Sequence, residues 1–335
     1  MILNKKRGRR SLMTIILIYM LSFVLTGCTS TAPETETIPT QTETDKGYQI
    51  ESRAVNILSA EEDYEMTIHF IDVGQGLAIL VQSDGKNLVY DGGDRNHSSF
   101  LVSYLKKQGV TDIEYLIASH YHEDHISGLV GCLSAFNVEN VIGPDYEQDS
   151  KIYRSFIEGV SAEGAEVWHP KVGTEFRFGT GKFTILAPQT ISSNHNDNSI
   201  VIKLVDGENS FLFMGDAEAD SEEAMCRSGM DLDSDVLVLG HHGSATSTSY
   251  AFLQETVPEF AVISCGEDNT YGHPDKDVMD KLEVMEIPVY RTDKQGSIKA
   301  VSDGESIAWN MEPCNDYSPG NEDDLGTQVQ SHSIR

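Results

Sequence analysis

The sequence has few basic residues and few cysteines. It holds 24 Lys and Arg against 53 Asp and Glu, so its formal net charge is -29. Such a negative field repels polyanions at long range and argues against a broad nucleic-acid-binding face, although a local basic groove or a metal centre would override it. The five cysteines include no CxxC pair. A zinc knuckle and a small fold held by disulfides are therefore not expected.

Long apolar runs are missing after residue 30, so no later segment is expected to span a bilayer. The N-terminus combines basic residues at 5–10 with an apolar run at 12–25 and ends Leu-Thr-Gly-Cys at Cys28. This pattern is typical of a targeting signal and resembles the lipobox of bacterial lipoproteins. It predicts a signal peptide over residues 1–27, lipidation of Cys28, and a domain held at the outer face of the cytoplasmic membrane. A plain signal peptide or a signal anchor is the alternative.

Strand-like and helix-like runs alternate from residue 63 to residue 312 without an internal repeat, which predicts one α/β domain of about 250 residues. Residues 28–62 are rich in Thr, Glu, Pro and Ser and predict a flexible tether, whereas residues 313–335 predict a disordered tail. Helices are expected near 98–108, 127–136, 153–162, 217–228, 249–256 and 275–286. The pairing of the remaining cysteines stays open: Cys132, Cys226, Cys265 and Cys314.

Histidine is scarce, with 11 in the chain, yet three fall in the segment Ser-His-Tyr-His-Glu-Asp-His at residues 119–125. The segment follows the strand-like run 115–118 and precedes a helix expected from Ser127. His120 and His122 stand two apart and can point to one side of an extended loop, while Asp124 and His125 can face a second position. Imidazole and carboxylate ligands together suit zinc, and also manganese or iron. The segment therefore predicts a metal site.

This segment resembles the His-x-His-x-Asp-His signature of the metallo-β-lactamase superfamily. Residues 88–93 (Leu-Val-Tyr-Asp-Gly-Gly), 211–216 (Phe-Leu-Phe-Met-Gly-Asp) and 236–244 (ending Gly-His-His-Gly-Ser) resemble its other motifs and stand in the expected order. The resemblance covers roughly residues 66–310. It implies an α/β fold of the four-layer αβ/βα sandwich type and two divalent metal ions, zinc or manganese.

The same resemblance implies a role for each motif residue. One ion would be held by His120 and His122. The other would be held by Asp124, His125 and one of the pair His241/His242, and Asp216 would bridge the two ions. We take His242 as the ligand, which leaves His241 to contact the substrate or protonate the leaving group. His273, in Tyr-Gly-His-Pro, is a second candidate for that role. The remaining residues, Asp72 and Asp91, would hold the metal ligands in position without contacting the ions.

Residues 70–76 (Phe-Ile-Asp-Val-Gly-Gln-Gly) resemble the opening of the extracellular hydrolase domain of ComEC-type competence proteins and related phosphorylcholine esterases. Two positions depart from that branch. Leu77 stands where the branch continues with Asp. The run Asn-Asp-Asn at 196–198 stands where many members of the superfamily carry a histidine ligand, so Asn196 or Asn198 would coordinate weakly, or His195 would substitute. The ion at His120 and His122 would then be bound more weakly than the other.

Three functions stay open. The first is an extracellular phosphodiesterase or phosphoesterase acting on a nucleic acid strand or on a phosphorylcholine head group, through water activated by the two ions. The acidic composition disfavours the nucleic acid and tolerates choline. The second is hydrolysis of a carboxylic ester, a lactone or a β-lactam. The third is a non-catalytic, metal-containing surface binding lipoprotein.

Overall fold

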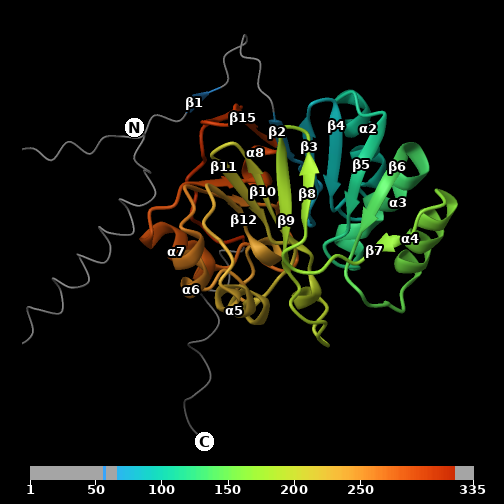
Figure 1. Ribbon diagram of the computed structural model, residues 1–335. Helices are drawn as coiled ribbons and strands as arrows, with labels where there is room; N and C mark the ends of the chain where they lie inside the picture. The colour runs from blue at the N-terminus through green and yellow to red at the C-terminus, as the bar shows by residue number, and fades with distance from the viewer. Residues whose placement is uncertain (1–55, 58–65, 321–335) are drawn as a thin grey trace, which may run out of the picture. The chain divides into compact units, whose positions relative to one another are not determined.

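Two β-sheets form the centre of the computed structural model, which describes residues 56–57 and 66–320 (Figure 1). The predicted signal peptide, Cys28 and most of the predicted tether lie outside the described residues. Among the described strands, the first sheet has the order β1-β16-β15-β2-β3-β4-β5-β6-β7. Its strands are β1 (Asn56–Ile57), β2 (Met66–Phe70), β3 (Ile79–Ser83), β4 (Lys86–Tyr90), β5 (Asp112–Ile117), β6 (Asn137–Ile142), β7 (Val167–Trp168), β15 (Ile298–Ser302) and β16 (Ile307–Trp309).

The second sheet has the order β14-β13-β12-β11-β10-β9-β8. Its strands are β8 (Glu175–Phe178), β9 (Gly181–Ala187), β10 (Val201–Asp206), β11 (Asn209–Phe213), β12 (Val236–Val238), β13 (Phe260–Ile263) and β14 (Val289–Arg291). Helices connect the parallel strands. They are α2 (Ser98–Lys107), α3 (Glu123–Ala135), α4 (Lys151–Ala162), α5 (Ala219–Ser228), α6 (Tyr250–Thr256) and α7 (Lys276–Val284). The short helix α8 (Thr292–Gln295) leads from β14 to β15 of the other sheet, and the 3-10 turns η1 (Asn196–Asn198) and η2 (Gly240–Gly243) lie in loops.

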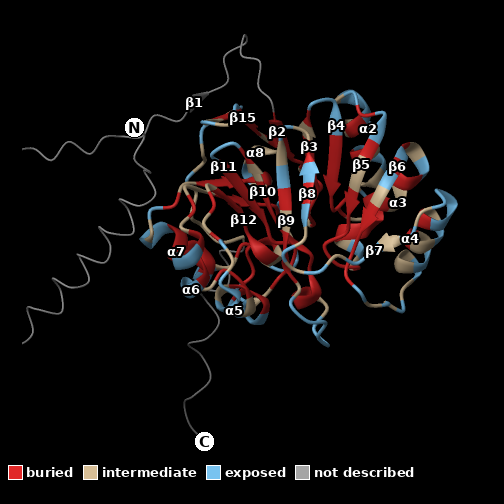
Figure 2. Cartoon of the chain, viewed as in Figure 1, coloured by how far each residue is buried: buried red, intermediate tan, exposed pale blue. Residues whose placement is uncertain are grey.

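Three apolar clusters divide the molecule into four layers. One cluster lies between the sheets and contains Ile68, Phe213 and Trp309. A second joins the first sheet to α2, α3 and α4, and a third joins the other sheet to α5, α6 and α7. Both faces of the central strands are therefore buried, as the red strands of Figure 2 show, whereas the edge strands β7 and β8 carry exposed residues. This αβ/βα arrangement confirms the predicted fold.

Parallel pairing sets the position of the polar loops. In the first sheet β4, β5 and β6 run parallel, and in the second β11, β12, β13 and β14 do. The carboxyl ends of parallel strands meet at one edge of a sheet, where α/β proteins place their sites. The loops after β4, β5, β11 and β12 carry the four predicted motifs.

The predicted disordered tail starts too early. Residues 313–320 are placed against β14 and the segment before α7, because Asn315 and Gly320 donate backbone hydrogen bonds to Val289 and Pro274. The fully buried Arg291 pairs with Asp293 and also donates to backbone carbonyls of this segment. A buried guanidinium needs several acceptors, and the segment supplies them. Strand β1 likewise falls inside the predicted tether.

Two other observations complete the fold. The four described cysteines are all free thiols, which answers the open question of their pairing. In the described part of the chain, every helix is too short or too polar to traverse a bilayer.

Candidate metal centre

The segment after β5 carries the first ligands. Asp91 follows β4, and its carboxylate accepts a 2.7 Å hydrogen bond from the backbone N–H of Ser119. Its other oxygen lies 2.7 Å from Nδ1 of His125. The predicted loop is shorter than expected, because α3 begins at Glu123 and places Asp124 and His125 in its first turn. A Cβ on Gly128 would overlap the carbonyl of Gly92, so glycine allows α3 to approach the Asp91 turn.

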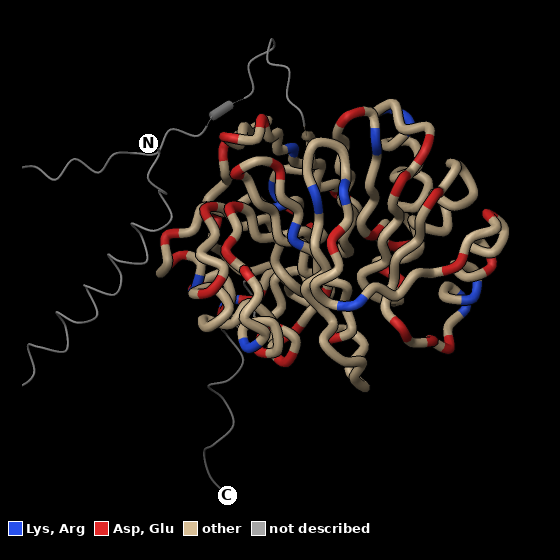
Figure 3. Tube along the Cα trace, viewed as in Figure 1, with Lys and Arg blue, Asp and Glu red and all other residues tan. Residues whose placement is uncertain are grey.

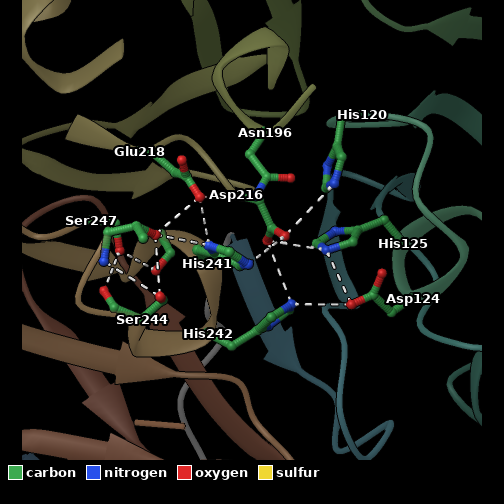
Figure 4. Close-up of polar contacts among 12 residues, drawn as sticks. His120, Asp124, His125, Asn196, Asp216, Glu218, His241, His242, Ser244 and Ser247 are labelled. Atoms are coloured by element: carbon green, nitrogen blue, oxygen red, sulfur yellow. Dashed lines mark hydrogen bonds and ion pairs between the residues drawn. The ribbon is translucent and has the colours of Figure 1, made fainter. Parts of the chain in front are cut away.

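Asp216 follows β11 and lies between the histidines. Its Oδ1 is 3.1 Å from Nε2 of His125 and 3.5 Å from Nε2 of His242. Its Oδ2 is 3.7 Å from Nε2 of His120 and 3.8 Å from Nε2 of His241. One carboxylate oxygen therefore faces each side of the site (Figure 4).

The histidine pair after β12 sits in an unusual turn. His241 and His242 both have left-handed backbone angles, with φ of 50° and 57°. Such conformations are costly for residues other than glycine and persist where the surrounding structure imposes them. The turn directs both Nε2 atoms toward Asp216. The Nδ1 atoms face opposite supports, which are Ser264 O for His242 and Glu218 for His241.

The side chains form two potential metal-binding groups in the described part of the chain. One is His120, His125 and Asp216, and the other is Asp124, His125 and His242, with donor atoms within 4.8 Å of one another in each. The buried Nε2 atoms of His120, His125 and His242 have no hydrogen-bond partner. Buried polar atoms are normally satisfied. Convergent, unpaired imidazole nitrogens beside carboxylates therefore fit divalent metal ions.

Charge complementarity agrees with that fit. Burial raises the pKa of Asp216, but the imidazoles of His125, His242 and His120 outweigh it and hold the pKa well below its ordinary value. Burial likewise opposes protonation of His125, yet Asp216, Asp91 and Asp124 raise its pKa well above the ordinary value. For His120, burial and the neighbouring His125 together lower the pKa well below the ordinary value. The ionised Asp216 carboxylate thus favours positive charge at the centre of the buried site, which suits bound cations.

A model of the metallo-beta-lactamase superfamily matches residues 71–267. The chain belongs to this superfamily. It is 33% identical over 235 residues to Recombination protein 2 of Haemophilus influenzae, covering 68% of this chain and 28% of that protein. It is 28% identical to ComE operon protein 3 of Bacillus subtilis (72% and 33% covered) and 31% identical to Competence protein ComA of Neisseria gonorrhoeae (72% and 33%). The chain therefore spans about a third of the length of these relatives.

Two superfamily positions differ from the expected ligand set. His122 is not part of either compact group, although its ring centroid lies 4.5 Å from that of His120. His195 packs against Tyr146 with ring centroids 4.8 Å apart and planes tilted by 33°, its ring lies 6.0 Å from that of His122, and it belongs to neither compact group. Asn198 uses both ends of its amide on the backbone of Ser192. A metal-binding role for Asn198 therefore has no free atom to support it.

The Gly-Gln-Gly segment that resembles the competence branch lies next to the site, against His273 and Gly266. Asp72 accepts from the backbone N–H of Gly74, so it stabilises its own turn, and no contact joins it to the described metal-binding groups. Gln75 lies 3.5 Å from Nδ1 of His273 and also accepts from Gly266. Leu77, at the departing position, is buried between the sheets. The carboxylate that the branch carries there has no counterpart in this chain.

His273 lies at the wall of the site rather than among the ligands. Its ring centroid is 5.5 Å from that of His241 and 6.4 Å from that of His242. Burial, followed by the neighbouring His242 and His241, lowers the pKa of His273 to about 4. A neutral imidazole can orient a substrate oxygen by hydrogen bonding, but it is a poor source of a full proton near pH 7.

Sequence reasoning missed several supporting residues. Glu218, Ser119 and Ser264 each hold a side chain of the site, and Ser264 does so through its backbone carbonyl. Glu218 follows Asp216 by two residues, and that spacing is the only signal that could have suggested it. The carbonyl of Ser264 has no side-chain signature at all.

Proposed function

We propose that the chain is a metal-dependent phosphodiesterase or phosphoesterase, carried at the outer face of the cytoplasmic membrane on a lipidated Cys28. The observation that supports this proposal best is the position of Asp216. Its two oxygens face different histidine groups, so a single buried carboxylate can hold two cations close together. Two closely spaced ions suit the in-line displacement of phosphoryl transfer. Two divalent ions, zinc or manganese, fit the donors.

The protein's own groups prepare the site for that chemistry. When bound, divalent ions supply Lewis acidity, which lowers the pKa of a water molecule and neutralises charge on a phosphoryl oxygen. Asp91 keeps the Nε2 lone pair of His125 directed inward by accepting at Nδ1. His273 would hydrogen-bond a substrate oxygen.

Tyr271 supports an organic substituent on the substrate. It is 68% exposed and stacks on His273, with ring centroids 5.6 Å apart and planes at 21°. An exposed aromatic face beside the site suits a nucleobase through stacking or a trimethylammonium group through cation–π attraction. The names of the relatives favour the nucleic acid strand. The formal net charge of -29 instead favours a cationic choline group, and Figure 3 shows acidic positions outnumbering basic ones along the described chain.

The test is hydrolysis by the full chain, purified in detergent and reconstituted with zinc or manganese. The panel pairs bis-p-nitrophenyl phosphate and single-stranded DNA with p-nitrophenyl phosphorylcholine and a β-lactam. Asp216→Ala removes the bridging carboxylate. Asp206→Ala is the matched control, because Asp206 is also buried and lies at the far end of β10.

Turnover of a phosphoester that is lost in Asp216→Ala and kept in Asp206→Ala supports the proposal, and the preferred substrate selects between DNA and phosphorylcholine. Cleavage of the β-lactam alone would instead indicate a hydrolase of carboxylic esters, lactones or β-lactams. Full metal loading without turnover of any substrate in the panel favours a surface binding module and contradicts the proposal.

A further inference from the structure

The segment after β16 runs along an edge of the second sheet. Residues 313–320 contain no helix or strand, yet they are held to β14, which ends the described order of that sheet. The backbone N–H of Asn315 donates to Val289 O at 3.4 Å, and its Oδ1 accepts from the Val289 N–H at 3.2 Å. The Tyr317 hydroxyl donates to Ile287 O at 3.0 Å. Edge strands expose backbone groups, and the segment pairs some of them.

A buried arginine fixes the course of this segment. Arg291 is fully buried at the end of β14, and its Nη1 donates to the carbonyl oxygens of Asp316, at 3.0 Å, and Ser318. Its Nε and Nη2 pair with Asp293. Because a buried guanidinium without acceptors is costly, the segment cannot leave this course without a loss of stability.

The segment ends against the wall of the metal site. The backbone N–H of Gly320 donates to Pro274 O at 2.9 Å. A Cβ on Gly320 would lie 2.1 Å from the carbonyl oxygen of His273 and 2.8 Å from that of Gly272, so the two backbones are in direct contact. Gly320 therefore supports the residue whose ring neighbours the histidine pair of η2.

Asn269 ties the loop between β13 and α7 into one unit. Its Nδ2 donates to the carbonyl oxygens of Gly266, at 2.9 Å, and His273, at 2.6 Å. Its Oδ1 accepts from the backbone N–H groups of His273, at 3.0 Å, and Tyr271, at 3.2 Å. The amide thus uses both donors and both lone pairs inside the loop. A shift of His273 is consequently passed to Tyr271, which stacks on its ring.

We propose that residues 313–320 act as a brace that sets the position of Tyr271 and His273 beside the metal centre. The brace acts through the loop 266–275 and so contributes to substrate binding from a distance. The residues of the compact metal-binding groups follow β5, β11 and β12, outside both segments. The brace should therefore govern substrate affinity and leave metal binding unchanged. Its effect on substrate rests on the proposed function, whereas its effect on the loop does not.

Gly320→Ala tests the brace in the metal-loaded full chain. The added methyl group either pushes His273 aside or separates Gly320 from Pro274, and both changes release the loop. The matched control is Gly181→Ala. A Cβ there would lie 2.2 Å from Val205 O, so the same kind of overlap falls at the far end of β10. Circular dichroism verifies that each variant is folded.

The first readout is hydrogen–deuterium exchange of residues 266–275, which requires no substrate. Loss of one hydrogen-bonded support should raise exchange of this loop by about 5- to 10-fold in Gly320→Ala and leave it unchanged in Gly181→Ala. Asn269→Asp should have the same effect as Gly320→Ala, because a carboxylate cannot donate to the loop carbonyls. Unchanged exchange in a folded Gly320→Ala protein would overturn the inference, whatever its activity.

The second readout is the hydrolysis of bis-p-nitrophenyl phosphate. Gly320→Ala should raise KM by about fivefold while kcat stays within twofold and the zinc content equals that of the parent. Combined with Tyr271→Ala, its effect on KM should be less than additive, since both changes act on one ring. An unchanged KM, a fully additive rise or a loss of zinc would overturn the positioning role. If the parent hydrolyses no phosphoester, the proposed function fails and hydrogen exchange alone decides on the brace.

Discussion

Replacing Asp91 with Asn tests how far the metal centre depends on a residue that never faces the metal. Asp91 is fully buried and must accept twice, from the backbone N–H of Ser119 and at Nδ1 of His125. Asparagine has only one acceptor oxygen. If that oxygen serves Ser119, the amide N–H₂ faces Nδ1 and moves the His125 proton to Nε2. If it serves His125, two donors confront each other at Ser119.

Either arrangement weakens metal binding. A proton on Nε2 removes the lone pair that His125 directs into the site, and a broken Ser119 contact displaces the loop that carries His120. Supporting partners of this kind are typically worth 10- to 100-fold in metal affinity, or about 1.4–2.8 kcal/mol. The buried unsatisfied donor should also reduce the free energy of unfolding of the metal-free protein by about 1–3 kcal/mol.

The assay is chelator competition with zinc on metal-free full-length protein, together with urea unfolding of the same preparations. Asp206→Asn is the control, because Asp206 is buried and accepts two hydrogen bonds, from Thr180 and Ser302, far from the site. It should lose stability without losing metal affinity. A folded Asp91→Asn protein that binds both zinc ions within twofold of the parent would refute the reasoning.

Three further substitutions test other parts of the structure. Burial, followed by the charge of Lys299, lowers the pKa of His69 from 6.5 to about 4. Because the folded state disfavours the protonated ring, the contribution of His69 to the free energy of unfolding is complete above pH 6.5 and is lost as the pH falls toward 4. At pH 5 that loss is about 2 kcal/mol. His69→Gln, which cannot titrate, should show a smaller drop in urea midpoint between pH 7 and pH 5 than the parent, and equal drops would contradict this. Arg291→Met should lower the free energy of unfolding by about 3–5 kcal/mol, since it leaves Asp293 buried without its partner, and a calorimetric loss below 1 kcal/mol would count against the role of this pair. Gly128→Ala should lower the free energy of unfolding by at least about 1–3 kcal/mol through overpacking, and it should weaken zinc binding because it moves the Asp91 turn. Unchanged zinc affinity would contradict the idea that the position of α3 controls the geometry of the site.

The fold was largely predictable because its central strands are short but uninterrupted apolar runs. Runs such as Phe211–Met214 and Val236–Leu239 are buried on both faces, so they read as strands without any alternation. The short edge strands were not expected. β7 and β14 contain two and three residues and carry too little pattern to be distinguished from loop. Their existence depends on the neighbouring strand, which no local signal reports.

Part of the candidate site was likewise predictable from the sequence, and part was not. The spacing of residues 119–125 places His120, Asp124 and His125 near one another because a strand end and a first helical turn lie in sequence. The choice between His241 and His242 could not be made from sequence, since it depends on two left-handed residues and on Glu218 and Ser264 in other segments. The helix start at Glu123 was also missed, because the histidines there are poor helix formers and its first turn is held by Asp91 and Gly92 from another loop.

Residues that converge on Asp216 come from both halves of the sandwich. His120, Asp124 and His125 follow a strand of the first sheet, and Asp216 and His242 follow strands of the second. Ions bound between them would hold the two sheets together along one edge, much as a crosslink closes a loop of about a hundred residues. Metal loading should then govern how readily the sheets separate. A domain stripped of its ions would open first at this edge, and a protease added under native conditions would cut there before it cut elsewhere within residues 66–312.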